Sequence, residues 1–368
     1  MSSSTAKAQK DITRAIFDFV CGLLFLCTFS VGLAGQENPA LPQKDKTSTQ
    51  PSMRVSFVNP AAPGEAFWDR VTRLMQEEAQ ARHIQLAVHY AQGNRLKVLE
   101  LVRQIIAQEP KPDYLIFVFQ AQLGEHLLGL TEAAGLPSFS INTNIPEQEV
   151  AAIGYPRQKY RYWLGHMFPD EQSAGFTLAQ SLVEQARKQS GSALNRPLTM
   201  IAIGGGHDSA ASVERLEGLT IFLNAQPNVT LAQTVKASWQ KDKSRDMAEV
   251  LLRRYPETSI IWTASDLMAL GALQAAEIQG KVSGKTVFAG GFDGTIEGLV
   301  AIYEGRMQAT MSGHYLEGAR ALTLLHAHFN GQDFADTVGT RIRTKLTLID
   351  SGNVSSFLSE HVPSASTK

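Results

Sequence analysis

The chain has 368 residues, which is too long for one small hydrophobic core and predicts about two domains. Hydrophobic residues make up 43% of it and charged residues 19%, with a formal net charge of −1. This balance favours neither nucleic acid nor an anionic membrane surface as a partner. Both cysteines, Cys21 and Cys27, lie near the amino terminus, so the remaining sequence offers no disulfide, thiolate nucleophile or cysteine-ligated metal.

Residues 1–35 are typical of a secretory signal peptide. Three basic residues precede an apolar core at 19–33, and small residues follow where a signal peptidase cuts. The alternative is an uncleaved membrane anchor, but the apolar run is short for a span of about 20 residues, so we expect cleavage. Residues 36–52 are polar and contain prolines, which predicts a disordered linker.

Strands and helices are expected to alternate regularly in the first half of the remaining chain. Short apolar runs predict strands at 55–58, 84–90, 114–119 and 137–142. Apolar residues at helical spacing predict helices near 67–79, 96–106 and 125–134. A strand at 162–167 then precedes a helix at 173–187. Such alternation predicts a doubly wound sheet of parallel strands.

The same pattern returns after a polar stretch at 189–195. Strands are expected at 198–203, 229–235, 260–262, 287–289 and 307–312, with helices at 213–223, 244–255, 267–276, after 294, and at 316–329. A last alternating strand is expected at 343–349. Two α/β halves joined by several crossovers suit a hinge-bending binding protein.

Two aspartates follow successive buried strands in this second half. Asp266 comes after the strand at 260–262, and Asp293 comes after the strand at 287–289 within the run GGFDG. Open parallel sheets bind ligands beyond the carboxyl ends of their strands. Helix capping would explain either aspartate alone, but the presence of both favours a ligand site on this edge.

The segments TASDLMALGAL and GGFDGT resemble the signature of type I periplasmic binding proteins, the superfamily of ribose- and galactose-binding proteins and lac-repressor-like regulators. The resemblance implies two doubly wound parallel-sheet domains of the α/β class joined by a multi-strand hinge. It divides the chain into an amino-terminal lobe at 53–168, completed by 314–342, and a carboxyl-terminal lobe at 169–313, completed by 343–358. Residues 359–368 would form a tail.

In the first lobe the resemblance implies five ligand-binding residues. Asn59 with Phe67 and Trp68 is similar to the family's asparagine-plus-aromatic element, and which aromatic ring reaches the cleft stays open. Asn142 and Thr143 stand where ribose and galactose binders carry an Asp-Arg pair or a similar pair. The missing bidentate arginine argues against ribose itself as the ligand.

In the second lobe and the crossover the resemblance implies five more ligand-binding residues. Arg215 matches the arginine that bonds sugar hydroxyls, and Trp239 lies where the family places an aromatic ring against the sugar face. Ser265 replaces a common asparagine, and Asp293 matches the hydroxyl-accepting aspartate. His314 stands near a position that is often glutamine.

Other kinds of site are weaker interpretations. The glycines at 204–206 lack the spacing of a nucleotide-binding loop, and His166, His207 and His314 lack a zinc-ligand spacing. The sequence carries no recognisable nucleophile elbow or catalytic carboxylate motif. We therefore expect no cofactor, no metal and no enzyme activity. Repressors of this superfamily carry an amino-terminal helix-turn-helix, which the predicted signal peptide replaces here, so we expect no nucleic-acid binding.

The sequence thus predicts a monomeric periplasmic protein that captures a small sugar or polyol between two lobes and delivers it to a membrane ABC permease. The alternative is a sensor of the autoinducer-2-receptor kind, which signals to a membrane kinase or cyclase. The altered segment at 163–170 and the altered Asn142-Thr143 pair leave that alternative open.

Overall fold

The computed structural model of the protein describes residues 52–189, 197–207 and 209–359. The predicted signal peptide, nearly all of the predicted linker and the tail beyond residue 359 lie outside these ranges. Among the helices in the described ranges, none combines the length and apolarity that crossing a membrane requires.

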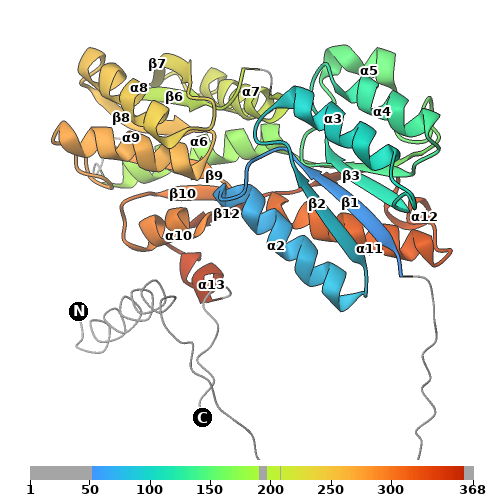
Figure 1. Cartoon of the computed structure of the whole chain (residues 1–368). Helices are drawn as coiled ribbons and strands as arrows, with labels where there is room; N and C mark the ends of the chain where they lie inside the picture. The colour runs from blue at the N-terminus through green and yellow to red at the C-terminus, as the bar shows by residue number, and fades with distance from the viewer. Residues whose placement is uncertain (1–51, 190–196, 208, 360–368) are drawn as a thin grey trace, which may run out of the picture. The chain divides into compact units, whose positions relative to one another are not determined.

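Lobe 1 is built on a six-stranded sheet with the order β11-β5-β4-β3-β1-β2, in which all neighbours are parallel. Its strands are β1 (Arg54–Asn59), β2 (Gln85–Tyr90), β3 (Tyr114–Val118), β4 (Ser138–Ile141), β5 (Trp163–Pro169) and β11 (Arg341–Thr344). Its helices are α2 (Ala66–Ala81), α3 (Arg95–Ile106), α4 (Gly124–Ala133), α5 (Glu147–Ile153), the short η1 (His314–Leu316), α11 (Glu317–Phe329) and α12 (Ala335–Val338) (Figure 1).

Lobe 2 is built on a second six-stranded sheet, with the order β12-β10-β9-β8-β6-β7. Its strands are β6 (Leu198–Gly204), β7 (Val229–Lys236), β8 (Thr258–Thr263), β9 (Phe288–Phe292), β10 (Ala309–Ser312) and β12 (Thr347–Asp350). Its helices are α6 (Glu171–Gln189), α7 (Ala210–Asn224), α8 (Lys241–Arg254), α9 (Asp266–Ile278), α10 (Ile296–Tyr303) and α13 (Val354–Ser359). Only β12 is antiparallel to its neighbour in the described sheet, so the predicted α/β class with two parallel sheets is confirmed.

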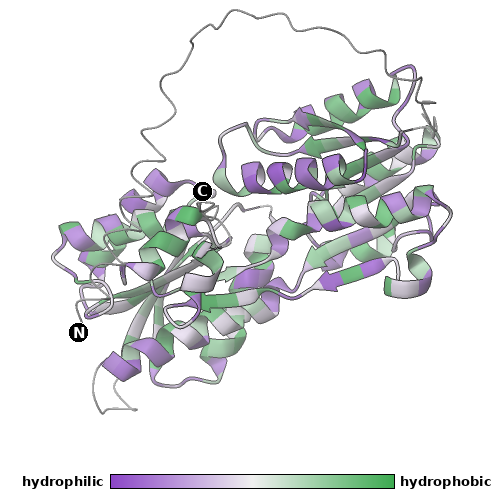
Figure 2. Cartoon of the chain, turned by 90° about the horizontal axis from the view of Figure 1, so that it is seen from below, coloured by the Kyte–Doolittle hydropathy of each residue, from purple (hydrophilic) through white to green (hydrophobic). Residues whose placement is uncertain are grey.

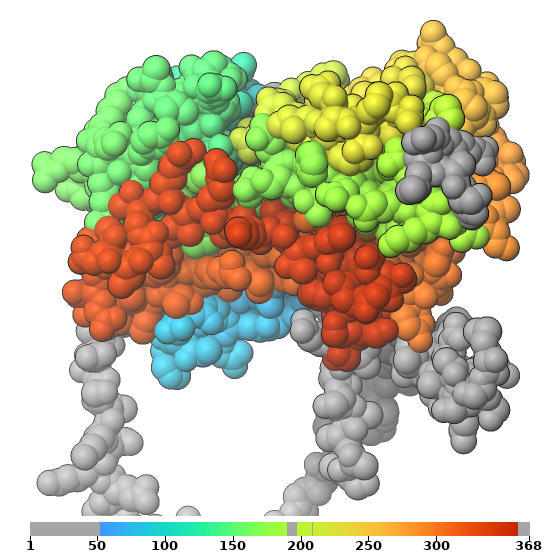
Figure 3. Space-filling view, turned by 180° about the vertical axis from the view of Figure 1, so that it is seen from behind, coloured from blue at the N-terminus to red at the C-terminus, as the bar shows by residue number. Residues whose placement is uncertain are grey.

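The chain passes between the lobes three times within the described residues, from β5 to α6, from β10 to η1 and from β11 to β12. The single strand predicted at 343–349 is wrong. Residues 341–344 pair with β5 in lobe 1, and residues 347–350 pair with β10 in lobe 2. Alternating polarity continues through both pieces, so the pattern does not reveal the point at which the chain changes sheets. Figure 3 shows the carboxyl-terminal segment, in red, lying against residues of both lobes.

Helices cover both faces of the lobe 1 sheet. Helices α2 and α11 pack on one face, where Met75 and Leu322 are fully buried. Helices α3 and α4 pack on the other face, against Phe117 and Phe119. Figure 2 shows hydrophobic and hydrophilic residues alternating along the helices, as expected when one helix side covers a sheet and the other meets solvent.

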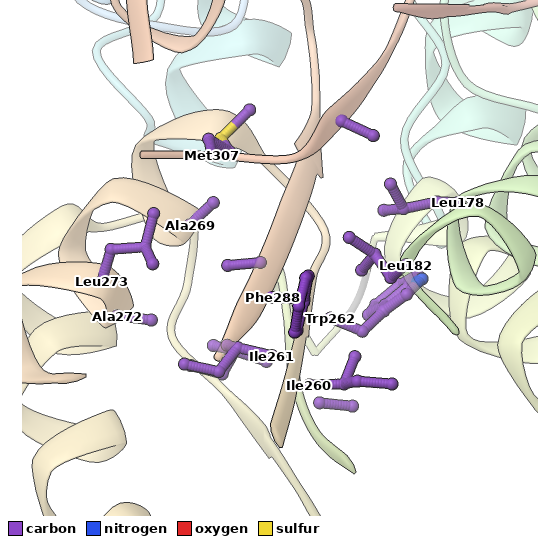
Figure 4. Packing of buried hydrophobic residues seen from close by; sticks show 14 of the residues in the cluster. Leu178, Leu182, Ile260, Ile261, Trp262, Ala269, Ala272, Leu273, Phe288 and Met307 are labelled. Atoms are coloured by element: carbon purple, nitrogen blue, oxygen red, sulfur yellow. The ribbon is translucent and has the colours of Figure 1, made fainter. Parts of the chain in front are cut away.

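The core of lobe 2 is one continuous hydrophobic cluster around β8 and β9. Leu178 and Leu182 of α6 approach these strands from one side, and Ala269 and Leu273 of α9 approach from the other (Figure 4). The indole of Trp262 is fully buried and donates a hydrogen bond of 3.3 Å to the Gly175 carbonyl. A strand that is apolar on both sides is buried on both sides, as the sequence pattern predicted.

Helices α6 and α7 approach each other closely because glycines stand at their contact. A Cβ atom on Gly175 would lie 2.0 Å from the Arg215 carbonyl oxygen, and one on Gly218 would lie 1.9 Å from the Gln172 carbonyl oxygen. Neither backbone can move without separating the helices. This close approach brings Glu171 of α6 beside Arg215 of α7.

We expect Gly218→Ala to lower the free energy of unfolding by about 1 to 3 kcal/mol, because the added methyl group overpacks the contact between α6 and α7. Urea unfolding of the purified protein measures the change. The matched control is Gly129→Ala in α4, where the new Cβ meets nothing within 4 Å. That variant should be about 0.5 to 1 kcal/mol more stable than the parent. Equal stability of the two variants would show that the helices are not in contact there.

Candidate functional site

A cavity of about 610 Å³ lies at the carboxyl ends of the strands, and residues of both lobes line it. Nine of the ten predicted ligand-binding residues are among those that line it: Phe67, Trp68, Asn142, Thr143, Arg215, Trp239, Ser265, Asp293 and His314. The fold thus brings together side chains from segments more than 200 residues apart in the sequence.

Asn59 is the predicted residue that does not line the cavity. Its side chain is fully buried at the end of β1. The amide donates to the Thr72 hydroxyl at 3.0 Å and accepts from the Ala61 backbone N–H at 2.9 Å. Both ends of the amide are therefore bonded within lobe 1 and stabilise the loop after β1. This structural role accounts for an asparagine at this position without any contact to a ligand.

Both candidate aromatic residues at the start of α2 line the cavity. The Phe67 ring stacks on the His314 imidazole, with centroids 4.6 Å apart and planes 25° apart. The Trp68 ring meets Phe67 edge to face at 5.1 Å. Lobe 1 therefore contributes one continuous aromatic surface, which extends onto the crossover residue His314.

Trp239 supplies the aromatic surface of lobe 2. Ser238 and Trp239 both have positive φ angles, 53° and 65°, and this left-handed pair turns the chain before α8. The indole lies so close to Gly205 that a Cβ atom there would be 2.2 Å from the ring. The glycine run at 204–206 thus makes room for an aromatic side chain, which is a structural reason for it other than phosphate binding.

Arg215 forms an ion pair with Glu171, a carboxylate that was not predicted as part of the site. Its Nε and Nη2 donate to the two Glu171 oxygens at 2.7 and 2.6 Å, and its Nη1 donates to the Ala264 carbonyl at 2.6 Å. Both side chains are almost fully buried. Burial by itself would lower the pKa of the guanidinium, but the carboxylates of Glu171, Asp293 and Asp266 together outweigh burial and the pKa is raised. A bidentate pair of this kind fixes both position and orientation.

Asp293 and His314 meet at the junction of the two lobes. The His314 Nε2 lies 3.3 Å from Asp293 Oδ1, and the Arg215 Nη1 lies 3.8 Å from the same oxygen. Asp293 has a φ angle of 102° although it is not glycine, and its backbone N–H bonds to the Met311 carbonyl. Strained backbone of this kind persists only where neighbouring structure enforces it, and it is concentrated at functional sites.

Ser265 and Asp266 have different tasks at the start of α9. The Ser265 hydroxyl caps the helix by accepting the Met268 N–H at 3.3 Å. Asp266 instead accepts the Thr295 N–H at 2.8 Å, next to the start of α10. Burial and the nearby Asp293 raise the pKa of Asp266 well above its ordinary value. Asp266 thus joins two helix starts and does not mainly cap its own helix.

Asn142 lines the cavity and has a buried hydrogen-bond donor without a partner among the described residues. Its backbone is left-handed, with φ of 71°, and its N–H donates to Glu317 Oε2 at 2.8 Å. The residue is 9% exposed, and its Nδ2 has no partner among the described residues. A buried amide donor without a partner is unfavourable, and a ligand acceptor would satisfy it.

Glu317 fixes this residue from α11 and accepts a second hydrogen bond from the Thr344 hydroxyl of β11. Its carboxyl is almost fully buried, and burial raises its pKa to about 8. One carboxyl group therefore ties the loop after β4 to the strand that leads into the third crossover.

The lobes also touch beside the cavity. Asn144 of lobe 1 donates to Glu214 of lobe 2 at 2.9 Å, and Arg70 of α2 donates to the Gly294 carbonyl at 2.6 Å. Burial raises the pKa of Glu214 to about 7. These contacts were not predicted, since each joins residues far apart in the sequence.

Six further polar residues line the cavity without having been predicted as ligand contacts: Glu65, Arg95, Gln120, His207, Ser209 and Ser238. The Oε1 of Gln120 has no partner among the described residues, and Arg95 donates to the Ala121 carbonyl. Glu65 precedes α2 and caps it. The sequence signal that could have identified Glu65 is an acidic residue just before the Phe67-Trp68 pair. For Glu171 and Glu317 no local pattern distinguishes them from surface glutamates.

The three histidines considered as metal ligands have separate environments. His166 is fully buried in lobe 1, where its Nδ1 lies 2.8 Å from the Ser140 hydroxyl and burial lowers its pKa to about 3. His207 and His314 both line the cavity. Within the described part of the chain, no group of three or more His, Cys, Asp or Glu residues is arranged to hold a metal ion.

The raised pKa of Glu317 predicts a pH dependence of stability. Between its ordinary pKa of 4.5 and the folded value of about 8, the unfolded chain has released a proton that the folded protein keeps. Unfolding therefore becomes more favourable as pH rises, by up to about 1.4 kcal/mol per pH unit. We expect Glu317→Gln to gain stability relative to the parent from pH 5 to pH 8, as measured by urea unfolding.

The exposed residue Glu277 provides the control for this comparison. Glu277→Gln removes the same charge from the surface of α9 and should keep a constant difference from the parent over the same pH range. If Glu317→Gln behaved in the same way as this control, the buried carboxyl of Glu317 would be ionised throughout.

Comparisons with known proteins place this cavity in context. The family model of the periplasmic binding protein domain matches residues 55–333. The chain is 32% identical over 140 residues to the ribose import binding protein RbsB of Haemophilus influenzae, covering 38% of this chain and 42% of that protein. It is 32% identical over 124 residues to the D-allose-binding periplasmic protein of Escherichia coli, covering 33% and 39%. The chain thus aligns with about two fifths of the length of each relative.

Among solved structures, a periplasmic sugar-binding protein from Pseudomonas fluorescens has a TM-score of 0.76 with this chain at 27% identity, covering 84% of this chain and 90% of that one. This structural likeness includes both lobes, whereas the sequence alignments to the two relatives are partial. The family match extends over most of the chain, from β1 into the segment after α11. The chain therefore belongs to the periplasmic binding protein family.

Proposed function

We propose that this protein captures a small sugar or related polyol in the cavity between its lobes. The observation that carries the proposal is one cavity in which both lobes supply hydrogen-bonding groups and both supply aromatic surfaces. Such a site recognises a molecule with an apolar face and several hydroxyl groups.

The polar groups suit hydroxyl recognition. Asp293 supplies acceptors, Asn142 supplies an unpartnered donor, and Arg215 is fixed in place by Glu171 so that its remaining N–H groups have one orientation. Trp239 from lobe 2 and Phe67 from lobe 1 offer rings to the C–H side of the ligand. The absence of an Asp-Arg pair at residues 142 and 143 argues for a sugar other than ribose.

Binding would act by lobe closure. A ligand that contacts Asn142 and Asp293 at once stabilises the arrangement in which the two lobes are near each other. The three crossovers supply the hinge about which the lobes would move. Such a change would present a ligand-bound surface to a membrane partner.

We further propose that the protein works in the periplasm and delivers its ligand to a membrane ABC permease. The relatives reported above are named for ribose import and for D-allose binding in the periplasm, which supports transport. They do not favour the alternative role as a sensor that signals to a kinase or cyclase. The chemistry proposed is binding without turnover.

A thermal-shift screen against monosaccharides, polyols and autoinducer mixtures tests this proposal. A ligand at 100 times its dissociation constant adds about 2.7 kcal/mol of stability, which raises the melting temperature measurably. We expect a shift with one sugar or a small group of related sugars. Silence across all sugars, with a shift from a different metabolite, would refute sugar capture.

Replacement of the central carboxylate provides a second test. We expect Asp293→Ala to weaken sugar binding by 10-fold or more, because ligand hydroxyls lose a charge-assisted acceptor. Isothermal titration with the sugar identified in the screen measures the change. Asp242→Ala on α8 removes a carboxylate that is 81% exposed and should leave affinity unchanged. Unchanged affinity in Asp293→Ala would remove Asp293 from the ligand site.

A further inference from the structure

We propose that Glu65 binds the ligand directly and that the cavity prefers sugars with a protonated amino group over their neutral and acidic counterparts. This inference rests on the proposed function as a sugar-binding protein. It concerns a residue outside the expected set of ligand contacts and specifies the chemical class of the ligand.

Glu65 is fixed at the wall of the cavity by the helix that it caps. Its Oε1 accepts the Phe67 N–H at 3.3 Å, and its Oε2 accepts the Trp68 N–H at 2.9 Å. The residue lines the cavity, and its backbone is extended, with φ of −82° and ψ of 119°. Helix N-caps are usually serine, threonine, aspartate or asparagine, which cap with shorter side chains. A glutamate here places a carboxyl group beside the cavity, with lone pairs left for a ligand.

A second carboxylate reaches the same cavity from the other lobe. Phe67, within the turn that Glu65 caps, stacks on His314, and His314 lies 3.3 Å from Asp293. Burial is the largest cause of the raised pKa of Glu65, and the nearby Asp293 carboxylate raises this pKa further. A ligand group between them would therefore meet carboxylate oxygens from both lobes.

The negative charges of Glu65 and Asp293 are only partly balanced by the cationic side chains beside them. Arg215 is bound through two hydrogen bonds to Glu171 and lies 3.8 Å from Asp293, so two carboxylates share one guanidinium group. Arg95 also lines the cavity, and it donates a hydrogen bond to the Ala121 carbonyl.

Among the described residues, the carboxylates of Glu65, Asp293 and Glu171 outnumber the guanidinium groups of Arg95 and Arg215, although Glu171 pairs with Arg215 and does not itself line the cavity. A buried carboxylate is unfavourable without a partner of opposite charge, and an ammonium group brought by a ligand would supply that partner. A neutral hydroxyl can donate a hydrogen bond to the same oxygens but brings no charge. A carboxylate or phosphate on the sugar would add repulsion. The same arrangement therefore predicts a ranked order of affinity.

Isothermal titration of the purified protein against glucosamine, glucose and glucuronic acid, and against the matching galactose series, measures that order. At about pH 6.5 an amine of this kind is largely protonated. We expect an amino sugar to bind at least 10-fold more tightly than its neutral counterpart, and the acid to bind most weakly. Glu65→Gln keeps an oxygen for the helix cap and should reduce the preference for the amino sugar to about threefold or less.

Asp69→Asn is the matched control. Asp69 is an exposed carboxylate in the same helix, accepts the Gly64 N–H and does not line the cavity, so its replacement should leave the preference intact. Melting temperatures of both variants without ligand report on folding. If Glu65→Gln did not fold, the order of affinities in the parent protein would by itself test the preference for amino sugars.

Neutral sugars that bind as tightly as amino sugars would overturn the preference while leaving sugar capture in place. A preference that survives in Glu65→Gln would remove Glu65 from the contacts. Failure of every sugar in both series would count against the proposed function, and this inference would fall with it.

Discussion

The geometry of the cavity depends on the ion pair between Arg215 and Glu171, which joins α6 and α7. Two short hydrogen bonds fix the guanidinium plane, and both side chains are withdrawn from water. The pair forms only because glycines let the two helix backbones approach closely. Breaking a buried pair of this kind leaves an uncompensated charge and is strongly unfavourable. The orientation of Arg215 toward Asp293 therefore follows from backbone packing in the core of lobe 2.

Left-handed backbone recurs at the cavity, at Asn142, Trp239 and Asp293, none of which is glycine. Each conformation is held by neighbouring structure: Asn142 by the Glu317 carboxyl, Trp239 by close packing on Gly205, and Asp293 by the Met311 carbonyl. Strain of this kind costs on the order of 1 to 3 kcal/mol per residue and persists where the surroundings enforce it. The side chains that line the cavity are thus held in one arrangement by the protein itself, and such preorganisation lowers the entropic cost of binding in general.

Much of the fold and site could be predicted from the sequence because the signals are local. Apolar runs at 198–203 and 260–262 predicted strands, and apolar residues at helical spacing predicted the helix at 267–276. The family signature around Asp293 then located side chains that do line one cavity. The prediction was wrong at 343–349, where alternating polarity continued while the chain changed sheets. It also missed Glu171 and Glu317, because a buried carboxylate differs from a surface one only through distant partners.

Asn59 shows why a residue type that matches a family position is not sufficient to assign a contact. Both ends of its amide are occupied within lobe 1, whereas the amide donor of Asn142 has no partner and lines the cavity. Asn59 ends β1, Asn142 directly follows β4 of the same sheet, and both are buried, so neither residue type nor burial separates them. What separates them is hydrogen-bond satisfaction, since a buried polar group without a partner is the one that a ligand can stabilise. The same criterion applies to charge, because Arg215 pairs with Glu171 and also lies 3.8 Å from Asp293, so that two carboxylates share one guanidinium group.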